Sequence, residues 1–280
     1  MKEGRLSTLD RASLRIRHGS ARFRESISGA PSRPIIFIHV PKTAGNSTVK
    51  YIQACVGEKI PRRHYMVHDN ETKLGREQDI RRARKARFVF GHMAWHAFEE
   101  IRDGRDVFSF TFLRDPLDRL LSNYAFLQAI TRPAHAEKHY PGIAQMSLAE
   151  YAACAHPLYR YGMDNFMVRQ FAGRLDEYPH VTSPAQEMLD RAKEHLSSLS
   201  FVGFTDRYDE SFAALIAKAG LPSPNITPRY NVTRQSGARK ESSQIDDATR
   251  RLLLDRVRLD MELWEFARDR FLPLLPARSA

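Results

Sequence analysis

The chain has 280 residues, of which 42% are hydrophobic and 28% charged, and it carries a formal net charge of +11 at pH 7. This length and mixture are typical of a globular protein with one large domain or two small ones. They exclude collagen, coiled coils, disulfide scaffolds and wholesale disorder. Residues 1–34, 61–87 and 229–240 have net charges of +5, +5 and +4, which favours an anionic partner: a polyanion, a membrane surface or a phosphorylated small molecule.

Cysteine is scarce, and no apolar run approaches the roughly 20 residues that a membrane span requires. Cys55 and Cys154 predict free thiols rather than a zinc site or a disulfide framework. Residues 1–30 contain no apolar core of a secretory signal, so we expect a cytoplasmic protein. We interpret residues 1–34 as a basic, flexible N-terminal arm, which also suits a peripheral contact with anionic lipid on the inner face of the membrane.

The first predicted element of the chain is a buried strand over residues 35–40, which is short, β-branched and bounded by prolines. A turn over residues 41–47 leads into a helix that ends near Gly57. Further short strands are predicted at residues 88–90 and 107–113.

The second half of the chain predicts mainly helices. Pro116 suits the first position of a helix that runs to about Ile130. A helical insertion is predicted over residues 130–180. The later predicted elements are a helix ending near Ser198, a strand over residues 201–204, a helix from about Asp209 to Gly220 and a long amphipathic helix over residues 246–271. Strands that alternate with helices pair in parallel, so the predicted fold is a three-layer α/β domain over residues 35–276.

Polar residues follow three of the predicted strands, where open α/β sheets bind their ligands. They are residues 41–47, Gly91 with His92, and Arg114 with Asp115. This coincidence predicts a binding site at the carboxyl edge of the sheet.

The loop after the first strand is a candidate anion cradle. Gly45 and Ala44 are small, and the N–H groups and dipole of a helix N-terminus attract negative charge. Lys42 adds a mobile cation. Hydroxyl donors are added by Thr43, Ser47 and Thr48. The Walker A pattern is missing because the lysine precedes the glycine, and an ordinary strand-to-helix turn with a solvent-exposed lysine is the alternative.

Further basic residues suit a phosphate. Arg114 can bind one bidentately, and Ser122, two turns into the next helix, can bond the same group. The alternative is a local ion pair between Arg114 and Asp115 beside a packed serine. A basic loop could close over a phosphate or simply connect two helices; it contains Arg234, Arg239 and Lys240.

His92 is a candidate general base toward a hydroxyl group, since an ordinary histidine has a pKa near 6.5. A structural histidine is the alternative. His96 follows at metal-site spacing, but no glutamate follows His92, so no metal is expected.

Together these segments resemble the sulfotransferases that use 3'-phosphoadenosine 5'-phosphosulfate. The similarity is greatest to the carbohydrate branch that includes the uronyl and heparan sulfate 2-O-sulfotransferases and their bacterial relatives. It covers residues 35–270 and is most specific over residues 37–47 and 112–122. Supporting segments are residues 90–92, Asp164 with Asn165, Arg169 with Gln170, residues 201–207 and residues 260–266.

The resemblance implies a P-loop-kinase-like fold and a set of roles. The 5'-phosphosulfate would lie on the loop formed by Lys42, Thr43, Ala44, Gly45, Asn46, Ser47 and Thr48. Arg114 and Ser122 would hold the 3'-phosphate, and Arg234, Arg239 and Lys240 would help cover the product, adenosine 3',5'-bisphosphate. His92 matches the catalytic histidine of the family. The implied acceptor is a hydroxyl group of a carbohydrate or glycolipid, reached by in-line transfer without a metal.

Two other functions remain open from the sequence. A P-loop kinase or NTPase would share the architecture, but the chain lacks a Walker A motif and a clear strand-end aspartate for Mg²⁺. A non-enzymatic polyanion-binding protein would explain the charge, but no nucleic-acid-binding motif supports it, and we expect no nucleic-acid partner.

Overall fold

The computed structural model describes residues 33–56, 73–129, 140, 142–173, 185–224, 227–228 and 245–277. At the centre of these residues lies a parallel sheet with the strand order β2-β1-β3-β4. Its strands are β1 (Ile35–Ile38), β2 (Phe88–Gly91), β3 (Phe108–Leu113) and β4 (Phe201–Phe204). The predicted α/β class is therefore confirmed.

Both faces of the sheet are apolar because alternate side chains of each strand point to opposite sides. In β1, Ile36 and Ile38 belong to one buried cluster, whereas Ile35 and Phe37 belong to the other. The second face is rich in phenylalanine, and the rings of Phe37 and Phe110 stack with their centroids 4.5 Å apart. The continuous apolar strands of the sequence thus match a sheet that is buried between two helical layers.

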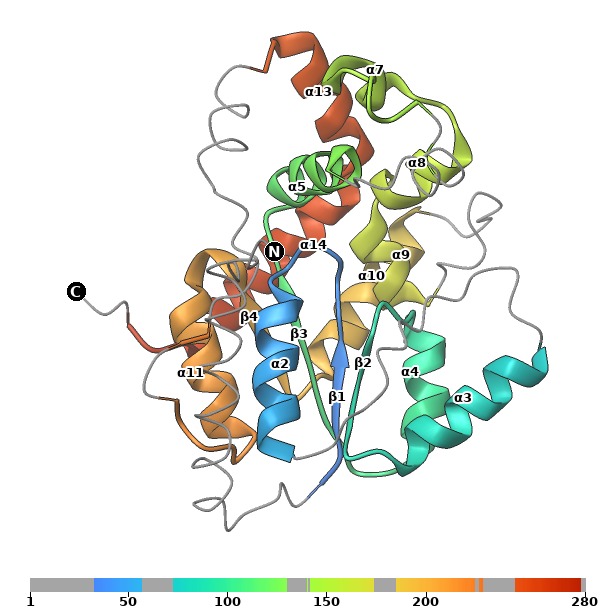
Figure 1. Ribbon diagram of the computed structural model, residues 1–280. Coiled ribbons are helices and arrows are strands. Elements are labelled where there is room, and N and C mark those ends of the chain that lie inside the picture. Colours follow the sequence, from blue (N-terminus) through green and yellow to red (C-terminus); the bar gives the residue numbers. More distant parts are fainter. Residues whose placement is uncertain are drawn as a thin grey trace, which may run out of the picture.

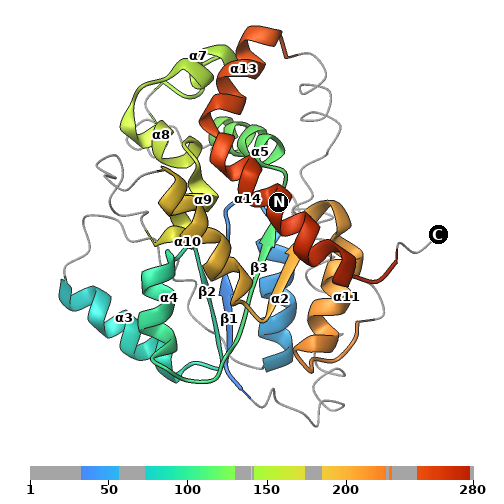
Figure 2. The same ribbon diagram turned by 180° about the vertical axis from the view of Figure 1, so that it is seen from behind.

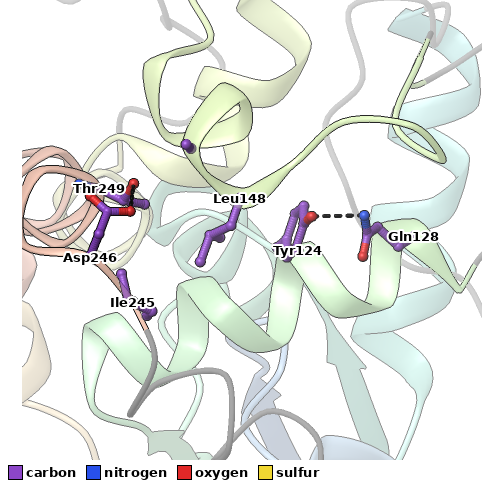
Figure 3. Close-up of a pocket in the computed structure, with 7 residues that line it drawn as sticks. Tyr124, Gln128, Leu148, Ile245, Asp246 and Thr249 are labelled. Atoms are coloured by element: carbon purple, nitrogen blue, oxygen red, sulfur yellow. Dashed lines mark hydrogen bonds between the residues drawn. The ribbon is translucent and has the colours of Figure 1, made fainter.

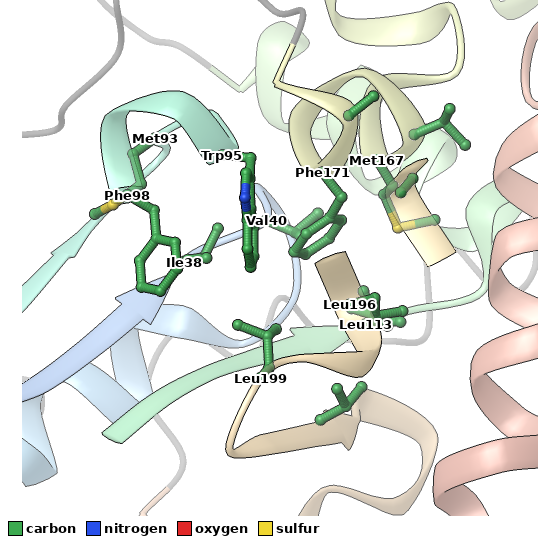
Figure 4. Close-up of a cluster of buried hydrophobic side chains, with 14 of the residues drawn as sticks. Ile38, Val40, Met93, Trp95, Phe98, Leu113, Met167, Phe171, Leu196 and Leu199 are labelled. Atoms are coloured by element: carbon green, nitrogen blue, oxygen red, sulfur yellow. The ribbon is translucent and has the colours of Figure 1, made fainter. Parts of the chain in front are cut away.

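Helices cover both faces of the sheet and complete three layers (Figures 1 and 2). On the phenylalanine-rich face lie α2 (Gly45–Val56) and α11 (Tyr208–Lys218), the latter after the short helix η1 (Thr205–Arg207). The opposite face, shown in part in Figure 4, is covered by α3 (Lys73–Lys85), α4 (Trp95–Arg102), α9 (Phe166–Ala172), α10 (Ala185–Ser197) and α14 (Arg258–Phe271), which η2 (Leu272–Leu274) follows.

A further group of helices lies beyond the carboxyl ends of the strands (Figure 1). It consists of α5 (Pro116–Gln128), α7 (Leu148–Ala153), α8 (Pro157–Met163) and α13 (Asp247–Arg256). These helices enclose their own apolar cluster around Leu120 and Tyr151. Within the predicted helical insertion, α7 and α8 join this group, whereas α9 packs on α10 in the main core.

The long helix expected over residues 246–271 is in fact two helices, α13 and α14, which are separated at Val257. The break has a tertiary cause. Asn165, which has a positive φ of 44°, accepts hydrogen bonds through Oδ1 from the N–H groups of Leu259 (2.9 Å) and Asp260 (3.3 Å). It thereby caps the start of α14, where the first N–H groups have no partner within the helix.

Asp260 caps α9 in return. Its carboxylate accepts from the N–H groups of Met167 (3.2 Å) and Val168 (2.8 Å). The side chain of Asp260 is also attracted to the Arg119 guanidinium, and both residues are almost completely buried. Two helices far apart in the sequence therefore satisfy the first N–H groups of each other.

Candidate functional site

Three strand ends that the sequence marked as polar lie side by side. The strand order places β1 between β2 and β3, so Lys42 after β1 lies between His92 after β2 and Arg114 after β3. The chain passes from β1 to one side for β2 and then to the other side for β3. Ligands in open α/β sheets bind where the strand order reverses in this way, at the carboxyl edge.

The loop between β1 and α2 has an unusual backbone. Lys42 and Ala44 have positive φ values of 71° and 61°, which are rare for residues with a side chain. Turns that bring residues into this region direct successive N–H groups toward one concave side, where anions bind. Gly45 begins α2, the N–H group of Ser47 donates to the Ala44 carbonyl (3.1 Å), and Asn46 is exposed.

Two of the expected hydroxyl donors bond within the protein. The Thr43 hydroxyl donates to the Val40 carbonyl at 2.7 Å, and that of Thr48 lies 3.3 Å from the hydroxyl of Tyr208. Both threonines are completely buried. Their side chains shape the loop, so the main chain and Lys42 are the groups of this loop best suited to contact an anion.

Lys42 and Arg114 bring two positive charges together. Arg114 Nη1 donates to the Lys42 carbonyl at 3.4 Å, and the Lys42 ammonium lies 4.2 Å from the ring centroid of Phe126 on α5. Burial, and then the charge of Arg114, lowers the pKa of Lys42. An anion at this edge would relieve both effects, so the residues fit a phosphate-bearing ligand. Ser122 lies half-buried on α5.

Asp115, beside Arg114, has a role in the helix that follows. Its Oδ1 accepts from the Asp118 N–H group at 2.9 Å and thus caps α5. Burial raises the pKa of Asp115. The Asp115 carboxylate therefore caps the N-terminus of α5, the helix that lies beyond the ends of the strands.

His92 is paired with a second histidine, His39, which the sequence analysis did not single out. His92 Nε2 lies 3.1 Å from His39 Nδ1, and the two rings are tilted by 64° with centroids 4.6 Å apart. The His39 ring also lies against Gly45, where an added Cβ would stand 2.0 Å from His39 Nε2. His39 thus connects the end of β2 with the start of α2. The sequence offered one signal for His39, namely a polar residue directly after the apolar residues of β1.

Gln170 of α9 binds the main chain at His39 and at Met93, the residue after His92. Its Nε2 donates to the carbonyl groups of Met93 (2.9 Å) and His39 (3.3 Å). The His39 N–H group donates to the Gly91 carbonyl at 2.9 Å. Because Gln170 is completely buried, these bonds tie the ends of β1 and β2 together in the core.

A separate pocket of about 300 Å³ lies between α5, α7 and the start of α13 (Figure 3). Its polar side chains bond to one another: Gln128 Nε2 donates to the Tyr124 hydroxyl at 2.8 Å, and the Thr249 hydroxyl donates to Asp246 Oδ2 at 2.6 Å. The remaining lining is largely apolar and includes Leu148. The described residues that line this pocket include none of the cations that gather at the strand ends.

Several predicted features fall outside the described residues, namely Arg234, Arg239, Lys240 and residues 1–32 of the basic arm. Among the residues that are described, no three histidine, cysteine or acidic side chains gather as metal ligands do. No helix in this part of the chain is long and apolar enough to cross a membrane.

The chain is 28% identical over 196 residues to "Heparan-sulfate 6-O-sulfotransferase 2" of Gallus gallus. The match covers 61% of this chain and 46% of that relative, so the chain matches less than half the length of the curated protein. This relative is a 6-O-sulfotransferase by name, whereas the sequence resemblance was drawn to the 2-O branch.

A family model described as "Sulfotransferase family" matches residues 27–267. The matched range includes all four strands and the polar loops that follow β1, β2 and β3. The expected resemblance is thereby confirmed at the level of the family, and the chain belongs to the sulfotransferase family.

Proposed function

We propose that residues 35–276 form a sulfotransferase domain that moves the sulfuryl group of 3'-phosphoadenosine 5'-phosphosulfate to a hydroxyl group of a carbohydrate or glycolipid. The observation that carries the proposal is the convergence of Lys42, Arg114 and His92 at the carboxyl edge of β1, β2 and β3. Membership of the sulfotransferase family supports the type of reaction.

The donor suits the charges at this edge. When bound, it supplies the sulfuryl group and leaves as adenosine 3',5'-bisphosphate. We assign the 5'-phosphosulfate to Lys42 and to the main chain that leads into α2, and the 3'-phosphate to Arg114 with Ser122. The lowered pKa of Lys42 supports this assignment, because an anion placed beside two repelling cations stabilises both of them. Arg234, Arg239 and Lys240 are proposed to cover the nucleotide.

The catalytic roles follow from the charge changes of the transfer. Lys42 stabilises the negative charge that grows on the leaving phosphate, as positioned cations do in phosphoryl transfer. His92 takes the proton of the acceptor hydroxyl, an effect of typically ~10²–10⁴-fold in rate. The fixed strand ends supply orientation, because Gln170 ties the chain around His92 to that around His39.

A carbohydrate acceptor is supported by the relative, whose name identifies heparan sulfate as its substrate. Phe126 supplies an exposed aromatic ring beside the Lys42 ammonium, and half of its surface is open to solvent. Flat aromatic rings at the mouth of a site suit the apolar face of a sugar. We therefore place the acceptor over Phe126, with its reacting hydroxyl toward His92.

The proposal is tested first by ligand binding. Adenosine 3',5'-bisphosphate at about 100 times its Kd should stabilise the protein by about 2.7 kcal/mol, and ATP–Mg²⁺ or duplex DNA at the same concentration should stabilise it much less. Equal shifts with all three ligands would favour a nucleoside-triphosphate or polyanion binder instead. Transfer of labelled sulfate to fractionated glycans and glycolipids then identifies the acceptor.

The role of His92 is tested separately. His92→Ala should keep the thermal shift with adenosine 3',5'-bisphosphate while its turnover falls by ~10²–10⁴-fold. His156→Asn is the matched control, because His156 is an exposed histidine that caps α8 and lies on no strand end. Full turnover in His92→Ala would remove the base assignment.

A further inference from the structure

We infer that His39 is a positioning residue for His92: it orients the His92 ring and selects the tautomer in which Nδ1 carries the lone pair that accepts a proton. The inference deepens the proposed function and rests on it, because it presupposes that His92 acts as the base. It starts from the 3.1 Å separation of His92 Nε2 and His39 Nδ1.

A hydrogen bond between two neutral imidazoles contains a single proton, so it fixes two tautomers together. If His92 Nε2–H donates to His39, then His92 Nδ1 carries a lone pair. If His39 Nδ1–H donates to His92, then His92 Nδ1 carries a hydrogen and cannot accept another. Only the first arrangement gives His92 an accepting nitrogen on the side turned from His39.

The anion site favours the first arrangement. His39 Nε2 lies against Gly45, within the loop that we assign to the donor phosphates. When His92 donates, His39 Nε2 carries the hydrogen and presents an N–H group to that loop. The other arrangement would turn a lone pair toward bound negative charge, which is repulsive. Binding of the donor and preparation of the base are therefore coupled through one ring.

The surroundings of His39 keep its ring in place. Its main chain is bonded on both sides, through its N–H group to Gly91 and through its carbonyl to Gln170. The ring lies between Gly45 and Phe37, whose ring centroid is 5.0 Å away. A hydrogen-bond partner held in this way can orient His92 without a loss of freedom during the reaction.

The same bond contributes when the proton moves. As the acceptor oxygen forms its bond to sulfur, the bond from sulfur to the phosphate oxygen breaks and its electron pair goes to that oxygen. The hydroxyl proton passes to His92 Nδ1, which makes His92 an imidazolium. His92 Nε2–H still donates to His39, now as a charge-assisted bond, and His92 later releases its extra proton to water. His39 itself neither gains nor loses a proton.

The tautomer is tested without turnover, in the protein with adenosine 3',5'-bisphosphate bound and no acceptor present. Correlation spectra of ¹⁵N-histidine-labelled protein distinguish Nδ1–H from Nε2–H tautomers, and His92→Ala identifies the His92 signals. We expect His92 to carry its hydrogen on Nε2 in the wild-type protein and a mixture of tautomers in His39→Leu. An Nδ1–H tautomer of His92 in the wild-type protein with adenosine 3',5'-bisphosphate bound would overturn the inference.

The kinetic test uses two replacements of similar size. His39→Asn keeps an accepting oxygen near the place of Nδ1, whereas His39→Leu fills the space without an acceptor. We expect kcat to fall about 10- to 100-fold in His39→Leu, the effect typical of losing an orienting partner. His39→Asn should restore most of that loss. Equal losses in both variants would show a packing role only and refute the inference.

His195→Asn is the matched control, since this half-buried histidine also has a ring hydrogen bond, from Nδ1 to the Phe171 carbonyl at 2.7 Å, but lies on α10. It should leave the His92 tautomer and kcat unchanged. Failure of the proposed function looks different from failure of the inference. In that case the wild-type protein transfers no sulfate to any acceptor, while the tautomer of His92 still responds to His39→Leu.

Discussion

Replacing Gly45 by alanine tests how closely the loop after β1 is built around His39. The new Cβ would lie 2.0 Å from His39 Nε2 and 2.3 Å from Cε1. The ring would have to retreat by roughly 1.4 Å to reach the 3.4 Å of an ordinary contact. A shift of that size is incompatible with the present 3.1 Å hydrogen bond to His92.

The expected cost is the sum of three effects. Overpacking costs about 1–3 kcal/mol, and loss of the hydrogen bond costs about 1 kcal/mol. The better helix propensity of alanine returns up to about 1 kcal/mol at the start of α2. The net destabilisation should be about 1–3 kcal/mol, which corresponds to a fall in Tm on the order of 2–12 °C.

A double-mutant cycle isolates the contact. We would measure the free energy of unfolding by urea denaturation for the wild-type protein, Gly45→Ala, His39→Ala and the double variant. In the His39→Ala background no ring opposes the new methyl group, so Gly45→Ala should be neutral or slightly stabilising. A coupling energy below about 0.5 kcal/mol, or a wild-type Tm in Gly45→Ala, would refute the reasoning.

Two further predictions concern charge. The pKa of Lys42 is lowered in the free protein and rises when an anion binds. At pH values between that lowered pKa and the ordinary 10.5, binding of adenosine 3',5'-bisphosphate should therefore be accompanied by the uptake of a proton. The affinity for the nucleotide should fall as the pH rises through this range. Calorimetry in buffers of different ionisation enthalpy measures the uptake, and an equally large uptake in Lys42→Arg, whose side chain stays charged, would contradict the assignment. Asp260→Asn leaves the Arg119 guanidinium buried without the nearby carboxylate that attracts it, and it should cost about 3–5 kcal/mol in urea denaturation. Arg258→Ala, which removes the exposed ion pair with Glu262, should change stability by less than about 1 kcal/mol. Similar effects of the two would contradict a stabilising attraction between the buried charges of Arg119 and Asp260.

The sheet could be predicted because its strands are buried on both faces. Residues 35–38 are apolar throughout, residues 108–113 are apolar except for Ser109 and Thr111, and the polar residues that follow these runs mark the carboxyl edge. The strand order was not accessible in the same way. Nothing local to β2 or β3 records that they pair on opposite sides of β1, and that order is what brings His92, Lys42 and Arg114 together.

The helices that escaped prediction show where local patterns fail. α3 contains six basic and two acidic residues among its 13, and over residues 77–85, whose side chains the structure describes, only Ile80 and Ala83 reach the core. α4 has eight residues, about two turns, too few for a clear period. The break at Val257 depends on Asn165, which is remote in the sequence, and no window of residues could contain both.

His39 was missed for a related reason. A single histidine at the end of a strand belongs to no repeating sequence pattern. Its role depends on two contacts that form only in the folded protein, with His92 and with Gly45. The glycine was instead attributed to the anion cradle. The structure adds a second requirement for glycine at this position, since any side chain there would displace the ring.

The mutual capping of α9 and α14 has a consequence for the order of folding. Asn165 and Asp260 are 95 positions apart, and α9 carries the Gln170 that ties the ends of β1 and β2 together. A contact of such long range closes late, because a large loop of chain must first be ordered. A nascent chain can therefore contain Lys42, His92 and Arg114 long before it is competent for catalysis. The arrangement of these residues is completed only after residue 260 has been synthesised and has packed against α9.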